Sequence, residues 1–96
     1  MDWYRIELSP NDAVSFESRW LVLYSKHGTP KGLFIFRGRN KKAQSQYFVP
    51  EPVRDAFRKF FANYDLQKCA QPRRGSLQAI GGSEDEVDEF YGRLVS

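Results

Sequence analysis

The sequence contains little sulfur chemistry and no long apolar run. It has one cysteine and one methionine, and its longest uninterrupted apolar stretch is the five residues from Trp20 to Tyr24. Cys69 stands alone, so no internal disulfide can form, which favours a reducing compartment. Five apolar residues fall far short of the ~20 needed to cross a bilayer, and the segment from Met1 to Arg5 lacks the pattern of a secretory signal. We therefore expect a cytoplasmic protein that does not contact membranes.

Histidine is equally scarce, because His27 is the only one. A metal site would have to take its other ligands from carboxylates and Cys69, with no recognisable spacing. Paired catalytic carboxylates, a phosphate-cradling glycine loop and a Ser/His/Asp set are absent as sequence patterns. We expect no metal, no cofactor and no enzymatic activity, and we interpret His27 as an exposed turn residue.

The aromatic content favours a folded chain. Apolar residues make up 41% of the sequence and aromatic residues 16%, which is too much for a disordered protein. A chain of 96 residues buries too little surface to divide its core between two units. We therefore expect residues 1–96 to form a single domain.

Four or five segments have the composition of strands. Tyr4, Ile6 and Leu8 alternate with charged residues, as in a half-buried strand. The segments 20–24 and 33–36 are apolar at every position, and a Gly/Pro-rich turn between them predicts an antiparallel hairpin. A second hairpin turns at residues 38–42 and returns along 44–49. A final strand is expected at 77–80.

The helical patterns complete the expected fold. A short helix is expected from Pro10 to about Phe16, and two longer ones near 52–65 and 84–95. The last of these is preceded by a capping box formed by Ser83 and Glu86. The predicted fold class is α+β: an antiparallel meander sheet of four to five strands with two helices packed on one face.

Positive charge is concentrated in the middle of the chain. Residues 18–75 hold thirteen lysines and arginines against three acids, a balance of +10, whereas residues 1–17 and 76–96 are acidic. Such a field attracts phosphate groups or an acidic partner. The predicted binding residues are Arg37, Arg39, Lys41 and Lys42 in one hairpin turn, with Lys26, Lys31, Arg73 and Arg74 if the fold brings them to the same side. Cations at a hairpin tip also keep a sheet edge soluble, which is the alternative reading.

A second signal is the excess of apolar side chains on the two central predicted strands. Both faces of 20–24 and 33–36 are apolar, so two helices would leave one face to be covered. The candidates for exposed interface residues are Trp20, Tyr24 and Phe34. The segment 9–17, a second copy of the chain, another protein or stacked nucleic-acid bases could each cover them.

These signals give three hypotheses. The leading one is a small non-enzymatic binding protein that contacts nucleic acid, or a nucleoprotein or nucleic-acid-processing protein, through the basic hairpin. The alternative is a protein-interaction module, an inhibitor or accessory subunit of the kind that mobile elements or operons encode, which docks on a larger enzyme through an apolar sheet face. A homodimer stays open. The third is a small ribonuclease that depends on Arg39, Lys42 and His27.

The leading hypothesis makes a testable prediction. Replacing Arg37, Arg39, Lys41 and Lys42 together by serine should weaken binding to single- and double-stranded oligonucleotides and flatten its salt dependence, because each phosphate contact releases counterions. Fluorescence anisotropy from low to physiological salt measures both effects. No binding by the unmodified chain even at low salt would eliminate the hypothesis.

Overall fold

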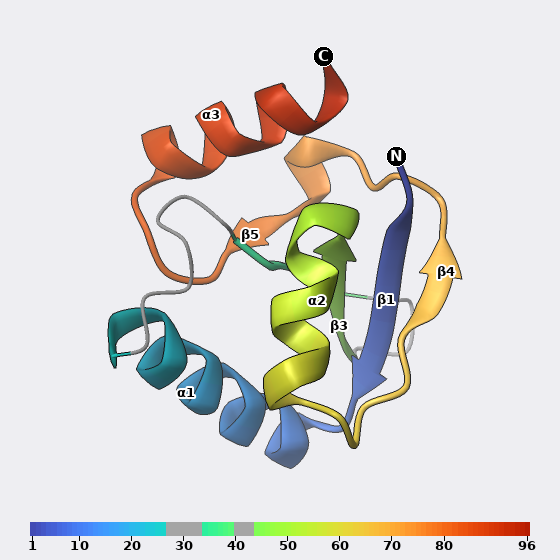
Figure 1. Ribbon diagram of the computed structural model, residues 1–96, viewed down its shortest axis with the longest axis vertical. Coiled ribbons are helices and arrows are strands. Elements are labelled where there is room, and N and C mark those ends of the chain that lie inside the picture. The colour runs from blue at the N-terminus through green and yellow to red at the C-terminus, as the bar shows by residue number, and fades with distance from the viewer. Residues whose placement is uncertain (27–33, 40–43) are drawn as a thin grey trace.

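The chain folds into a five-stranded sheet with three α-helices (Figure 1). The structure is a computed structural model that describes residues 1–26, 34–39 and 44–96, apart from the side chains of residues 23–26, Arg39 and Ala79. The strands are β1 (Trp3–Leu8), β2 (Phe36–Arg39), β3 (Ser45–Pro50), β4 (Gln67–Cys69) and β5 (Gln78–Ala79). The helices are α1 (Pro10–Lys26), α2 (Glu51–Phe60) and α3 (Glu84–Val95), with a short 3-10 turn at Arg74–Ser76.

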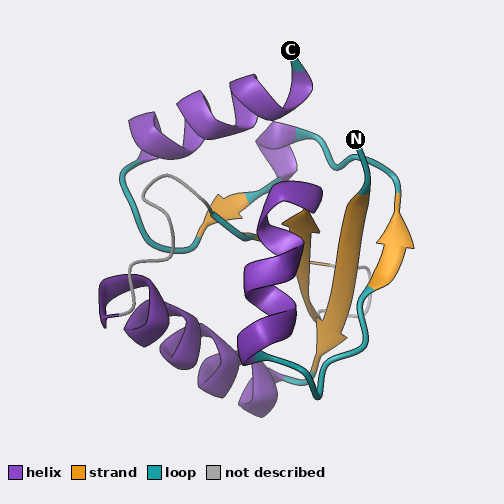
Figure 2. Cartoon of the chain, in the orientation of Figure 1, coloured by secondary structure: helices purple, strands orange, loops and turns teal. Residues whose placement is uncertain are grey.

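The sheet confirms the predicted α+β class but not the predicted strand order. Its strands lie in the order β4-β1-β3-β2-β5, and every neighbouring pair is antiparallel. Figure 2 distinguishes the strands from the helices around them by colour. The antiparallel pairing of the second predicted hairpin is present between β2 and β3, but β2 spans Phe36–Arg39 instead of the expected 33–36. The meander order is wrong, because the expected strand at 20–24 is helical and leaves β3 free to pair with β1.

Helix α1 replaces two elements that the sequence analysis separated. It runs for 17 residues, starting after Ser9, whose hydroxyl accepts from the backbone N–H of Asp12 at 3.3 Å. Ala13, Phe16 and Trp20 are buried at helical spacing, while Leu21 and Val22 are 45% and 50% exposed. The apolar run therefore winds around a helix instead of lining a strand, and the predicted hairpin of 20–24 with 33–36 does not form.

Helices α2 and α3 lie where the sequence predicts them. Pro52 occupies the first turn of α2, which ends at Phe60 and so is shorter than the predicted 52–65. At the start of α3 the Ser83 hydroxyl accepts from the Glu86 backbone N–H at 3.2 Å, and the Glu86 carboxylate accepts from the Ser83 N–H at 3.2 Å. None of the helices in the described ranges has both the length and the apolar composition needed to cross a membrane.

The helices cover both faces of the sheet, not one. Residues directly opposite each other on antiparallel strands project to the same face, so the register places Tyr4 and Tyr47 on one face and Trp3 and Phe36 on the other. On the first face α1 and α2 pack: Phe16 and Tyr47 have ring centroids 4.7 Å apart, and Arg54 donates to the Tyr4 hydroxyl at 2.8 Å. On the second face Trp3 and Phe36 contact Tyr91 of α3, at 6.1 and 6.0 Å.

Aromatic rings form the centre of the core between α1, α2 and the sheet. Phe16 lies within 6 Å of four other rings, which belong to Tyr47, Phe57, Phe61 and Tyr64. Each such ring buries a large apolar area, and tilted pairs at these distances add to the attraction. This cluster joins the middle of α1 to α2 and β3, and so fixes which side of α1 faces solvent.

Substitution of Gly82 tests the packing around the loop that leads into α3, and substitution of Gly92 is its control. Gly82 has φ +73°, and a Cβ there would lie 2.4 Å from Cε1 of the buried Phe34. Gly82→Ala should therefore destabilise the fold by about 2 kcal/mol, through backbone strain and overpacking. Gly92→Ala is the matched control, because it lies inside α3 with open space around it and should stabilise by about 0.5–1 kcal/mol. Urea denaturation measures both, and equal effects would contradict the described loop.

Candidate functional site

Two of the predicted binding arginines are neutralised by neighbouring acids. Arg37 on β2 donates through Nη1 to both carboxylate oxygens of Glu17, at 3.1 and 3.2 Å, and through Nη2 to the Gln78 amide oxygen. Arg74 donates to Asp88 at 2.8 Å and to Glu84 at 2.9 Å. These two guanidinium groups hold secondary structure together, so they do not contribute free positive charge to a docking zone.

Of the remaining predicted cations, only Arg73 has a side chain that the structure describes. Arg73 is exposed next to the 3-10 turn. The side chains of Lys26 and Arg39 lie outside the description, as do the whole residues Lys31, Lys41, Lys42 and His27. The nucleic-acid hypothesis stays a prediction that depends on those residues.

The predicted apolar platform is wrong for the two rings that the structure describes. Trp20 and Phe34 are both 0% exposed. Trp20 points from α1 toward Phe61, with ring centroids 6.2 Å apart, and Phe34 packs edge-on against Phe90 at 5.7 Å. The side chain of Tyr24 lies outside the described residues. Neither of these rings is available for contact, because Trp20 on α1 and Phe34 just before β2 are both packed inside the core.

A partly buried polar cluster ties α1 to the sheet. The Tyr47 hydroxyl donates to Glu17, whose carboxylate also accepts the two bonds from Arg37. Burial raises the pKa of the Tyr47 hydroxyl, and the hydrogen bond to the Glu17 carboxylate raises it further. Arg37 and Tyr47 supply hydrogen-bond partners for the Glu17 carboxylate, which would otherwise lie unpaired beside the core. Because Glu17 is on α1 and its two partners are on the sheet, the first role of the cluster is to orient α1.

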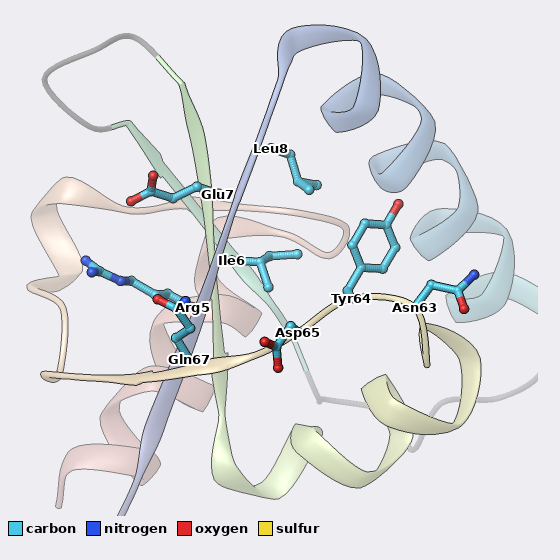
Figure 3. Close-up of a pocket in the computed structure, with 8 residues that line it drawn as sticks. All are labelled: Arg5, Ile6, Glu7, Leu8, Asn63, Tyr64, Asp65 and Gln67. Carbon is cyan, nitrogen blue, oxygen red and sulfur yellow. The ribbon is translucent and has the colours of Figure 1, made fainter.

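A small cleft lies beside β1, beyond the point where β4 stops pairing with it (Figure 3). Its volume is about 320 Å³, and it is lined mainly by β1 and by the chain that connects α2 to β4. The backbone N–H of Glu51 donates to the Asp2 carbonyl at 3.0 Å, so the Asp2 carbonyl points toward the β3 side of β1. The backbone N–H and C=O groups of successive strand residues point to opposite edges of the strand. Glu7 is an odd number of residues from Asp2, so its backbone groups point away from β3 and toward the cleft.

The side chains around this cleft are mostly polar. Figure 3 shows Arg5 and Glu7 on one side of β1, with Ile6, Leu8 and Tyr64 on the other. Glu7 accepts a hydrogen bond from Gln46 at 2.9 Å. The cleft can donate and accept hydrogen bonds, but it contains none of the predicted site residues. Across the described ranges, no group of three or more His, Cys, Asp or Glu could hold a metal ion.

The outward side of α1 is the clearest exposed apolar surface in the described part of the chain. Among its large hydrophobic residues, five are exposed, and three of these lie on α1: Val14 at 68%, Leu21 at 45% and Val22 at 50%. At 100° per residue they share one side of the helix with small polar residues. We call this surface the α1 stripe, and it comprises Asn11, Val14, Ser15, Ser18, Leu21 and Val22.

A groove borders the α1 stripe where α1 meets the end of α2. It has a volume of about 370 Å³ and is lined by Ser18, Arg19, Val22 and Phe60. Arg19 donates to the Phe60 carbonyl at 3.4 Å, and its guanidinium carbon lies 4.7 Å from the centre of the Phe61 ring. This arrangement caps the last turn of α2 and keeps the arginine at the rim of the groove.

The stripe was not predicted from the sequence, although a signal for it exists. Val14, Ser18, Leu21 and Val22 recur at i, i+4, i+7 and i+8, which is a helical period on the side opposite Phe16. Reading 20–24 as a strand hid that period.

Comparison of the chain with protein-family models, curated proteins and solved structures found no match. The function is therefore argued from the surfaces described above.

The Glu17 cluster predicts how stability depends on pH. The pKa of Tyr47 is raised in the folded protein, so the fold favours the neutral hydroxyl. The resulting contribution to the free energy of unfolding is fully present below the unfolded pKa of about 10. Above that pH the unfolded chain loses the proton first, so the free energy of unfolding should fall by about 1.4 kcal/mol per pH unit from this residue. Tyr47→Phe should remove that component. Urea denaturation of both proteins at about pH 9 to 11 tests this, and equal slopes would refute it.

Proposed function

We propose that the protein is a non-enzymatic protein-interaction module that docks on a larger protein through the α1 stripe. The observation that carries this proposal is the exposure of Val14, Leu21 and Val22 on one side of a single helix. Apolar side chains gathered in this way mark contact surfaces more often than scattered ones do. The docking surface differs from the one expected from the sequence, because it is a helix and not a sheet face.

The composition of the stripe supports the same proposal. None of its six residues is charged, although charged residues make up 28% of the chain. Depletion of charge is the compositional mark of the buried centre of an interface. Ser15 and Ser18 are small, so a partner can approach the helix closely between the aliphatic side chains.

The size of the stripe indicates the kind of complex. From Asn11 to Val22 it extends about 17 Å along the helix at ~1.5 Å per residue. Together with the groove, such a surface suits an interface at the small end of the range, below about 1,200 Å² in total. An inhibitor or accessory subunit that associates reversibly with a larger enzyme fits this size. The proposal places this action in the cytoplasm, since a lone cysteine fits a reducing compartment.

The burial of the opposite side of α1 makes the stripe rigid. Phe16 and Trp20 are 0% exposed, and Glu17 is tied to β2 and β3. A partner therefore meets a helix whose orientation is already fixed, so little ordering entropy is lost on binding. Contact with nucleic acid through the basic hairpin is a separate proposal, which the serine substitutions above test.

Site-specific photo-crosslinking in cells tests the proposal. The photoreactive amino acid p-benzoylphenylalanine at position 18 should give a discrete adduct with a partner protein, because position 18 is at the centre of the stripe. The same amino acid at position 89, on the exposed side of α3, is the matched control and should give none. Adding Val14→Ser and Val22→Ser should abolish the adduct.

These serine substitutions should leave the fold intact. Both side chains are at least half exposed, so each change should alter the free energy of unfolding by no more than about 0.5 kcal/mol. Equal adducts from positions 18 and 89, or an adduct that persists in the double variant, would contradict the proposal.

A further inference from the structure

The rim of the groove carries positive charge that no acid neutralises within the described residues. Arg19 contacts the Phe60 carbonyl and the Phe61 ring, and the Lys59 ammonium lies 5.6 Å from the centre of the Phe60 ring. Neither takes part in an ion pair among the side chains that the structure describes. Both cations are therefore held by aromatic and carbonyl groups and keep their full charge.

The surroundings leave this field largely intact. Arg58 is exposed in the last turn of α2, but at ~100° per residue it lies about 160° around the helix from Phe60, so the rim carries two cations, Arg19 and Lys59. The negative end of the helix dipole amounts to only about half a charge, so it offsets a small part of them. The acid closest along α1, Glu17, is occupied by Arg37 and Tyr47.

This charge decides what can occupy the stripe. A second copy of the chain in a two-fold interface would bring the same two cations toward their own images, and like charges across an interface are unfavourable. A nucleic acid would satisfy the cations but would leave Val14, Leu21 and Val22 against its phosphates and sugars. A protein segment that is both apolar and acidic satisfies both features.

We infer that the partner presents an amphipathic helix with an aliphatic ridge bordered by aspartate or glutamate. Its ridge packs on the α1 stripe and inserts one side chain into the groove over Val22 and Phe60, and its carboxylates pair with Arg19 and Lys59. This is the helix-in-groove mode of recognition, and the stripe is long enough for about three turns of the partner. The inference rests on the proposed function and adds the chemistry of the partner to it.

Two synthetic peptides test this partner class. Both are capped helices of about 18 residues, which is five turns, with the same leucine ridge, and they differ only in having glutamate or lysine along its borders. Titration of the isotope-labelled full chain, followed by its amide resonances, should show the glutamate peptide binding at α1 at least about tenfold more tightly than the lysine peptide at low salt. Raising the salt concentration should reduce that difference, because the pairs are exposed.

Charge variants show where the preference arises. Lys59→Glu should reduce the preference for the glutamate peptide severalfold, since it reverses one rim charge. Arg93→Glu on α3 makes the same change in net charge away from the groove and should leave the preference unchanged. Circular dichroism verifies that both variants fold.

Each other outcome overturns the inference in a different way. If both peptides bind α1 equally, the acidic partner is wrong but docking through α1 stands. The same conclusion follows if neither peptide binds and the chain itself dimerises through α1. If neither peptide binds, the chain stays monomeric and position 18 gives no photo-adduct, the proposed function fails as well.

Discussion

The insertion of Phe16 and Trp20 between the sheet and α2 is the contact on which the rest of the structure depends. Both side chains are fully buried, and the rings around Phe16 join α1 to α2 and β3. Once these two residues point inward, the period of the helix places Val14 and Val22 outward. The exposed apolar surface is thus a geometric consequence of the core, because an apolar run wound around a helix cannot bury every side chain.

Electrostatics act on this frame in two ways. Where an arginine meets an acid, as Arg37 meets Glu17 and Arg74 meets Asp88, the pair joins elements distant in the sequence and uses up its charge. Where a cation meets only rings and carbonyls, as at Arg19 and Lys59, the charge stays available to a partner. The net charge of +3 therefore does not distinguish cations paired with acids from cations that stay available to a partner.

Local patterns in the sequence were sufficient to predict the elements that are stabilised mainly by interactions between neighbouring residues. The alternation in β1, the proline and apolar period of α2 and the capping box of α3 depend on neighbours within a few residues, and all three are formed. The run from Trp20 to Tyr24 has strand composition but lies in α1, because Phe16 and Trp20 fit one helical face and tertiary packing overrides propensity. The pairing of Arg37 and Arg74 with acids could not be read from the sequence, since their partners come from other elements.

The account is tested most directly by the backbone and surroundings of residues 20–22 in solution, measured by NMR. It predicts helical Cα chemical shifts through this segment, nuclear Overhauser effects from the Trp20 indole to Phe61, and broadening of the Val22 methyl signals by a soluble paramagnetic probe. Strand-like shifts with cross-strand contacts from Trp20 or Val22 to Phe34 and Phe36 would contradict it, because the α1 stripe would then not exist.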